Sequence, residues 1–258
     1  MPRPTPARGR STPSPRSARP ASSGLTGKSA IPRPRRRLPP EEREQHIAEH
    51  AVRYFAEVGF DADTRALARE MGVTQSLIFR YFPTKEALVD RVYREVYVGR
   101  WKPAWEALIA DRSRPLPERL KELYVDYSHT ALTRDWVRIF MFSGLKGHDI
   151  NARYLTTLRR RVLEPVAAEV RAYLGLPGPD QVPLLEEEVE LVWSINARVF
   201  YYGQRSWIFD VPARVDVDRL VELTIDSFVE ASKVVVPRLV LPRLVDRPPR
   251  RSRKLVSK

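Results

Sequence analysis

The four histidines are the first side chains to test for catalytic or metal-binding chemistry, because such sites need defined spacing. His46 and His50 stand four residues apart, a helical spacing that could place two imidazoles on one metal ion. No third ligand follows nearby, so we expect exposed or half-buried histidines and no metal site. His129 and His148 are isolated from any triad-like spacing, and the sequence has no glycine-rich phosphate loop. These absences argue against an enzyme, and we expect no cofactor.

A different kind of chemistry, contact with another molecule through a helix surface, is indicated by residues 63–88, DTRALAREMGVTQSLIFRYFPTKEAL. The stretch reads as two short helices joined by a tight turn at Gly72. This is helix-turn-helix spacing. The apolar face that a small helical core needs would come from Leu67, Ala68, Met71, Val73, Ile78 and Phe82.

The second of these two helices is expected to have two faces. At about 100° per residue, Thr74, Ile78 and Phe82 fall on one side. Ser76 and Arg80 fall on the other side. We therefore expect one face to pack against the core and the other to be free to contact a partner.

Length and composition are those of a protein with an ordinary core. The chain has 258 residues, of which 43% are hydrophobic, enough for one large domain or two small ones. The absence of cysteine excludes disulfides, zinc ribbons and thiolate catalysis and suits a reducing cytoplasm. Because the sequence has no long uncharged apolar run, we expect no membrane span. The amino terminus also lacks the apolar region of a secretory signal.

The net charge of +13 resides in the two ends of the chain. Residues 1–40 carry nine arginines and one lysine without an acid, and residues 237–258 carry eight basic groups and one acid. These segments contribute +10 and +7, which leaves −4 for residues 41–236. Charge alone therefore does not indicate that the body binds DNA.

The ends have the composition of unfolded segments. Residues 1–39 are rich in Pro, Arg and Ser, and we expect a disordered basic arm. The arm could bind phosphates without sequence preference, or act as a transit peptide or as a nuclear signal around residues 33–37. A dispensable extension or a misassigned start codon explains the same composition. We expect residues 237–258 to form a basic flexible tail.

Between the ends, hydrophobic spacing predicts helices only, so the fold class is all-α. Pro39 and Pro40 precede two acids at the start of a first helix, which Gly59 closes as a left-handed cap. The next three helices have short capping side chains at their starts: Asp63 or Thr64, then Thr74, then Thr84.

The larger, carboxyl-terminal part is also predicted to be helical. Pro103 must kink or end the helix that reaches it, and Pro165 is a candidate bend in a long helix over residues 151–174. GLPGPDQVP marks a loop over residues 175–183. The last two long helices are expected at residues 185–209 and 216–236.

Residues 41–97 resemble the DNA-binding domain of TetR-type transcriptional regulators. The resemblance is carried by AVRYFAEVGF, TRALAREMGVTQ and IFRYFPTKEAL. Two departures stand out. The loop between Phe60 and Thr64 is about one residue shorter than is common, and Phe79 stands where the family usually has tyrosine. Because phenylalanine has no hydroxyl to donate to phosphate, that contact is not carried over.

The resemblance implies roles for individual positions. Thr64 and Lys85 would bind phosphates, and Tyr81 would approach the DNA backbone. Nearest the base edges would be Arg65, Gln75, Ser76 and Leu77. Arginine can bind guanine through two acceptors, glutamine can pair with adenine, and leucine offers apolar contact to a thymine methyl. Arg80 could contact a base or a phosphate, or remain solvated. With the cap residue included, the DNA-binding candidates are Thr64, Arg65, Thr74, Gln75, Ser76, Leu77, Arg80, Tyr81 and Lys85.

By the same resemblance, the body would bind a small-molecule effector and form a homodimer through the helices at 185–209 and 216–236. Both helices are apolar over wide faces, although they could instead pack only on each other in a monomer. Aromatic candidates for an effector pocket are Tyr124, Tyr127, Trp136, Phe140, Trp193 and Phe200. Plain core is the alternative for each of them. Arg138, Arg198 and Asn196 are possible polar anchors.

These expectations define four segments: a disordered basic arm at 1–39, a helix-turn-helix domain at 40–99, an effector-binding and dimerisation domain at 100–236, and a tail at 237–258. The expected function is that of a ligand-responsive repressor that binds a palindromic double-stranded DNA operator in the cytoplasm, on the nucleoid, and is released by a small hydrophobic or aromatic effector. The alternatives are an architectural DNA-binding protein dominated by its basic tails and, third, an enzyme.

Overall fold

The structure, a computed structural model, describes residues 38–245. Residues 39–245 belong to one unit. The arm expected at 1–39, apart from its last two residues, and the tail beyond residue 245 lie outside the described residues. Within the described part every regular element is a helix, which confirms the all-α prediction.

The amino-terminal head contains four short helices and a π-helical turn. Among them, α1 is the longest and carries the core residues Ile47, Ala51 and Phe55, which are inaccessible to solvent. The elements are α1 (Pro40–Val58), α2 (Thr64–Glu70), α3 (Gln75–Tyr81), α4 (Lys85–Tyr93) and η1 (Arg94–Val98).

The predicted caps set the boundaries of these short helices. The side chains of Asp63, Thr74 and Thr84 accept hydrogen bonds from backbone N–H groups two or three residues ahead, at 2.9, 3.3 and 3.1 Å. Gly72, between α2 and α3, has a φ of 65°, a left-handed value that favours glycine. The capping residues read from the sequence and the turn at Gly72 are thus confirmed.

Gly59 ends α1, but not with the left-handed cap predicted from the sequence. Its φ of 79° lies near the left-handed value, but its ψ of 172° is far from the value of about 47° that a left-handed cap requires, so the chain leaves the helix extended. A Cβ at this position would lie 3.3 Å from the Phe142 ring. Glycine is therefore required both by the backbone conformation and by the close approach of this aromatic side chain.

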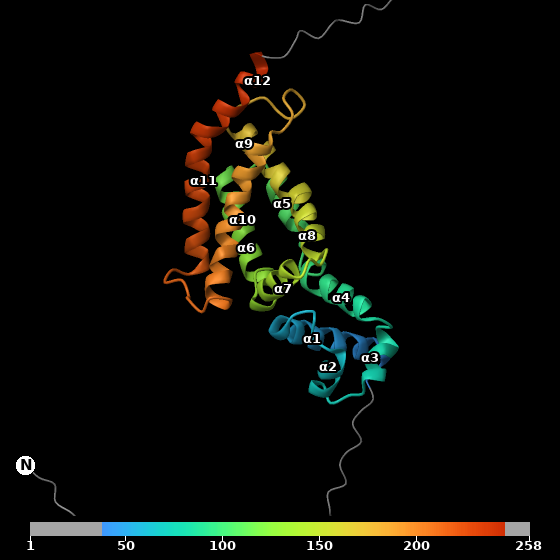
Figure 1. Ribbon diagram of the computed structural model, residues 1–258. Helices are drawn as coiled ribbons and strands as arrows, with labels where there is room; N and C mark the ends of the chain where they lie inside the picture. The colour runs from blue at the N-terminus through green and yellow to red at the C-terminus, as the bar shows by residue number, and fades with distance from the viewer. Residues whose placement is uncertain (1–37, 246–258) are drawn as a thin grey trace, which may run out of the picture. The chain divides into compact units, whose positions relative to one another are not determined.

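The body packs its helices around a shared apolar core. The longest helices, α10 and α11, run antiparallel side by side (Figure 1), and both contact further helices of the body. The elements are α5 (Pro103–Ala110), α6 (Leu116–Thr130), α7 (Arg134–Leu145), α8 (Ile150–Leu158), η2 (Arg159–Leu163), α9 (Glu164–Tyr173), α10 (Glu186–Trp207), α11 (Val217–Val240) and α12 (Pro242–Val245). None of the described helices is long and apolar enough to cross a membrane.

Prolines shape the body in three ways. Pro103 is the first residue of α5, and Pro165 lies in the first turn of α9, directly after the π-helical turn η2. Because proline cannot donate to the carbonyl four residues earlier, a wider turn at this point is expected. Pro237, by contrast, lies inside α11.

The prediction that an irregular tail begins at residue 237 is therefore wrong for residues 237–245. The helix α11 continues to Val240, and α12 follows it. Val236 and Val240 are both buried, so packing on each side of Pro237 holds the helix together despite the missing backbone donor.

A buried ion pair that the sequence did not reveal anchors the loop between α9 and α10. Arg171, fully inaccessible to solvent, donates from Nε to Glu188 Oε1 at 2.6 Å. Its guanidinium also donates to the carbonyls of Val182 at 2.5 Å and Pro183 at 3.0 Å. These bonds satisfy the buried charge and fix the loop against the start of α10.

Candidate nucleic-acid interface and body cavity

The helix α3 has the two faces expected from its sequence, except that Thr74, expected on the packing side, is exposed. Ile78 is 1% exposed and Phe82, which caps the helix, is 4% exposed, so this side packs into the head. Ser76 and Arg80 are exposed on the other side. Phe79 is also exposed. The helix is thus held by its apolar side while a polar side remains accessible.

Gln75, the first residue of α3, links the two helices of the helix-turn-helix. Its Oε1 accepts a hydrogen bond from Arg65 Nε at 3.1 Å, and its Nε2 donates to Thr64 Oγ1 at 2.9 Å. Thr64 is only 6% exposed, whereas Arg65 is exposed. The exposed Arg65 and the half-buried Gln75 therefore lie side by side at the surface, and the buried Thr64 holds Gln75 in place through its hydrogen bond.

The other candidate DNA-contacting residues surround this pair. The hydroxyls of Thr74 and Ser76 lie 3.0 Å apart, and both residues are exposed. Leu77 and Tyr81 on α3 and Lys85 at the start of α4 are half-buried. The structure thus brings the predicted positions together on the ends of α2, α3 and α4, with Thr64 as the one buried member.

The head is joined to the body through α7. Arg138 donates from Nε to the Ala56 carbonyl at 2.5 Å and from a terminal nitrogen to the Glu57 carbonyl at 3.2 Å. Its other terminal nitrogen donates to the Trp207 carbonyl at 3.4 Å. One guanidinium therefore meets the carboxyl-terminal carbonyls of both α1 and α10, where the helix dipole favours a cation.

Two exposed ion pairs add to this contact between head and body. Arg134 pairs with Glu57, and Lys146 pairs with Asp61 at 2.6 Å. Both pairs lower the carboxylate pKa, through a charged hydrogen bond from the basic partner. Because the groups are exposed, these pairs help to orient α7 on the head but contribute little to the free energy of folding.

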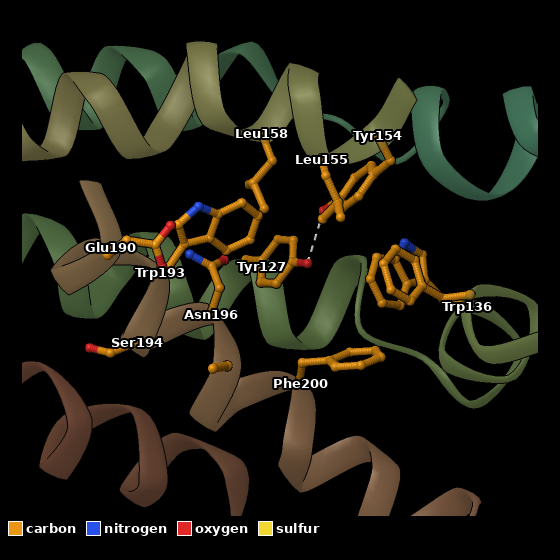
Figure 2. A pocket seen from close by; sticks show the side chains of 12 residues that line it. Tyr127, Trp136, Tyr154, Leu155, Leu158, Glu190, Trp193, Ser194, Asn196 and Phe200 are labelled. Atoms are coloured by element: carbon orange, nitrogen blue, oxygen red, sulfur yellow. Dashed lines mark hydrogen bonds between the residues drawn. The ribbon is translucent and has the colours of Figure 1, made fainter. Parts of the chain in front are cut away.

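The body contains a cavity of about 760 Å³ between α6, α7, α8 and α10 (Figure 2). Five of the six aromatic candidates line it: Tyr127, Trp136, Phe140, Trp193 and Phe200. Tyr124 does not line it. That side chain is fully buried one layer deeper, where its hydroxyl accepts a hydrogen bond from Asn196 Nδ2 at 3.0 Å.

Further residues of the cavity wall were not among the sequence candidates. On α10 they follow the helical spacing of Trp193 and Phe200, which could have identified them. Tyr154 and Leu158 come from α8, within the segment that was predicted as a long helix. These additional lining residues are Tyr154, Leu155, Leu158, Glu190, Ser194 and Ala197. Asn196, which was considered as a polar anchor, also lines the wall. The basic anchors considered, Arg138 and Arg198, are not part of the wall.

Hydroxyl groups at the cavity are buried and remain protonated. The hydroxyls of Tyr127 and Tyr154 lie 2.9 Å apart (Figure 2). Burial raises the pKa of Tyr127 to about 12 and raises the pKa of Tyr154 well above its ordinary value. Both are therefore neutral near pH 7, and they can donate or accept hydrogen bonds inside the cavity.

The cavity wall also touches the helix that leaves the head. Tyr97, in η1, packs against Trp136, Phe140 and Tyr154 with ring centroids 5.3, 6.5 and 5.2 Å apart. It also stacks on Tyr93 at the end of α4, at 5.4 Å. A change in the position of the wall would therefore act directly on the end of α4.

The described residues contain no group of three or more His, Asp or Glu side chains that could hold a metal ion. His46 and His50 contact each other, with ring centroids 4.5 Å apart. His148 packs its ring on Phe60 of the head, at 5.3 Å. In the described part of the chain these three histidines therefore serve packing.

Comparisons with known proteins agree with the helix-turn-helix geometry. The family model described as bacterial regulatory proteins, tetR family, matches residues 47–92. The HTH-type transcriptional regulator LuxR from Vibrio harveyi is 41% identical over 69 residues, 26% of this chain and 34% of that protein. The chain therefore matches about a third of the length of this curated relative.

Solved structures extend the similarity of fold over most of the chain. A TetR-like transcriptional regulator from Rhodococcus sp. RHA1 has a TM-score of 0.57 at 15% identity, over 75% of this chain and 97% of that chain. AmtR from Mycobacterium smegmatis has a TM-score of 0.52 at 20% identity, over 85% and 100%. At these identities the similarity concerns the fold. The family model shows a tetR-type segment over residues 47–92, and the solved structures show that the fold of the longer chain is similar to that of TetR-type regulators.

Proposed function

We propose that this protein is a ligand-responsive repressor that binds a palindromic operator as a homodimer and is released by a small hydrophobic or aromatic effector. The head would comprise residues 40–99 and the sensing and dimerising body residues 100–236. One observation carries the proposal: Tyr97, directly after α4, packs against three residues of the cavity wall. A ligand in the cavity would therefore meet side chains that support the helix leaving the head.

Each half-site would be read by the exposed side of α3. Arg65 and Gln75, which are hydrogen-bonded to each other, would contact base edges in the major groove, with Ser76 and Leu77 beside them. Lys85, Tyr81 and Thr64 would contact or support contacts to the phosphate backbone, which fix register but carry no sequence information. Arg80 remains available for a base or a phosphate.

Dimerisation would use the helices expected at 185–209 and 216–236, observed as α10 and α11. The outward side of α11 carries Leu223 and Val234, which are 43% and 51% exposed, together with the small residues Ser227 and Ala231. On α10, Tyr201 is 52% exposed. Apolar and small residues on one side of a helix pair are suited to a self-complementary interface between two copies.

Release would follow from a change in the separation of the two heads. In the ligand-free dimer the heads would fit successive major grooves, about one helical turn apart. Ligand binding would displace Trp136, Phe140 or Tyr154 and, through Tyr97, the end of α4. Because the ligand then favours a conformation with the wrong separation, operator affinity falls.

The architectural alternative places the binding energy in the basic segments outside the described residues. It predicts little sequence preference and no effect of a cavity ligand. Against it stands the cavity itself, which a purely architectural protein does not need. The proposed site of action is the cytoplasm, on the nucleoid.

Selection of bound DNA from a random pool tests the proposal. We expect the full chain to enrich a palindrome with two half-sites about one helical turn apart, and a screen for release to yield a cavity ligand. Enrichment of no sequence, or release unaffected by substitution of Trp136, would contradict it.

A further inference from the structure

The cavity has an uneven balance of charge. Among its lining residues Glu190 is the one charged side chain, and the remaining residues are aromatic, aliphatic, Ser, Asn or Ala. No ion pair or hydrogen bond with another described residue engages the Glu190 carboxylate at contact distance. The basic residue Arg159 lies on a neighbouring element, η2, but its guanidinium is engaged by Glu164 and Glu186 at 2.9 and 2.6 Å. In the described part of the chain the cavity lining thus offers an anion no basic side chain.

Aromatic faces form most of the wall around this carboxylate. Six of the twelve lining residues are aromatic: Tyr127, Trp136, Phe140, Tyr154, Trp193 and Phe200. Trp193 follows Glu190 by three residues on α10, so the two side chains are neighbours on the surface of one helix (Figure 2). The faces of aromatic rings attract cations, and tryptophan attracts them most strongly.

The polar groups at the cavity include further acceptors beside the carboxylate, as well as donors from the tyrosine hydroxyls and from Trp136 Nε1, which is buried without a hydrogen-bond partner among the described residues. Asn196 uses its amide nitrogen for Tyr124, so its amide oxygen remains available. Ser194 donates its hydroxyl proton to the Leu191 carbonyl at 2.6 Å and can only accept from a ligand. Carboxylate, amide oxygen and hydroxyl oxygen are the partners of a positively charged or N–H-bearing molecule.

We infer that the cavity takes a lipophilic aromatic cation, held by the aromatic wall and by Glu190. The inference rests on the proposal that this cavity is the effector site, and it names the chemical class of the effector. A neutral aromatic molecule would gain nothing from the Glu190 carboxylate, which is exposed at the cavity. An anion of the same shape would meet Glu190 with like charge.

The test uses two probes of nearly equal shape and opposite charge, tetraphenylphosphonium and tetraphenylborate. Each is titrated into the full-length protein without DNA, with tryptophan fluorescence as the signal because Trp136 and Trp193 line the cavity. We expect saturable binding of the cation at least about tenfold tighter than binding of the anion, although the chain carries a net charge of +13. Loss of cation binding in the variant Trp193→Leu would show that the fluorescence change reports binding of the cation in the cavity.

Two isosteric variants on one helix separate the cavity from general charge effects. Glu190→Gln should weaken cation binding about three- to tenfold and leave or improve anion binding. Glu187→Gln removes the same charge from a residue that is equally exposed on this helix but lies outside the lining, and it should change neither. Equal binding of both probes, no saturable cation binding, or equal effects of the two variants would overturn the inference. Because no DNA is present, failure of operator binding would leave this result unaffected.

Discussion

Arg65 Nε donates a hydrogen bond to Gln75 Oε1 at 3.1 Å, across the turn that separates α2 from α3. Gln75 in turn donates to Thr64 at 2.9 Å. Two of the polar side chains that are proposed to contact base edges are therefore positioned as one unit. Substitution of either residue should disturb the other, since a shared hydrogen bond makes mutational effects non-additive.

Arg65→Ala should relax sequence preference at one base pair of each half-site, at a cost of about 1 to 3 kcal/mol on the preferred sequence. Binding to a set of operators with single base changes measures this effect. The double variant with Gln75→Ala should lose less than the sum of the single losses. An equal loss on every sequence would instead make Arg65 a phosphate contact.

Deletion of residues 1–38 should flatten the dependence of DNA affinity on salt while base preference is retained. This segment carries nine arginines and one lysine and lies outside the described residues, apart from Leu38. Each phosphate that the arm no longer neutralises lowers the slope of log affinity against log salt by about one. Titrations of one operator at several salt concentrations give the slope. If the deletion abolished sequence preference, the assignment of reading to α3 would be in error.

The head could be predicted closely from sequence because its determinants are local. Asp63, Thr74 and Thr84 define helix starts through bonds only two or three residues long. The left-handed φ of Gly72 favours glycine independently of tertiary contacts. Such features leave a signature at fixed spacing, so the fold class and most boundaries were recovered.

The body was less predictable because its determinants connect distant residues. The bonds from Arg138 span 69 to 82 positions, and the bond from Asn196 to Tyr124 spans 72. No periodicity marks which aromatic side chains face a cavity and which, like Tyr124, lie behind it. The prediction that an irregular tail begins at Pro237 was wrong for a related reason. The burial of Val240, which keeps α11 helical, depends on packing against other elements.

Arg138→Met should lower the free energy of unfolding by about 1 to 3 kcal/mol, because it leaves carbonyls of Ala56 and Trp207 without their charged donor. The matched control is Arg134→Met on the same helix, which removes an exposed pair with Glu57 and should cost no more than about 1 kcal/mol. Urea unfolding of both variants measures the difference. Equal losses would show that Arg138 is merely another surface charge.

Stability should fall at alkaline pH through the buried tyrosines of the cavity. Burial raises the pKa of Tyr127 to about 12, above its ordinary value of 10.0, so the folded state holds the proton more tightly than the unfolded state. The stabilisation is therefore complete below about pH 10 and is lost as pH rises through about 12, at up to about 1.4 kcal/mol per pH unit. Tyr127→Phe removes this titration.

The measurement is the free energy of unfolding between about pH 8 and pH 11.5 for the wild type and for Tyr127→Phe. Below about pH 9 the variant should differ by a constant offset, since it lacks the hydrogen bond to Tyr154. Above about pH 10 its curve should fall less steeply than that of the wild type. Parallel curves over the whole range would mean that this hydroxyl reaches solvent before the protein unfolds.

If α10 and α11 form the proposed dimer interface, Val234→Asp should yield a monomer and weaken operator binding on the order of a hundredfold. Val234 is 51% exposed on α11 and lies on the same side of this helix as Leu223 and Ala231. Because a two-fold interface contains the same residue from both copies, the substitution would bury two carboxylates there. Without the partner each head binds a half-site alone and loses the gain from linkage. Sedimentation and operator titration of one preparation measure both effects.

Leu145→Asp provides the control, because Leu145 is 77% exposed at the end of α7 and lies on neither α10 nor α11. It introduces the same carboxylate and should leave the oligomeric state unchanged. If Val234→Asp remained dimeric with full operator affinity, the interface would have to lie elsewhere, and the exposed apolar side of α11 would need another partner. If it became monomeric yet kept its affinity, reading of a palindrome by two linked heads would be wrong, since affinity and dimerisation must fall together.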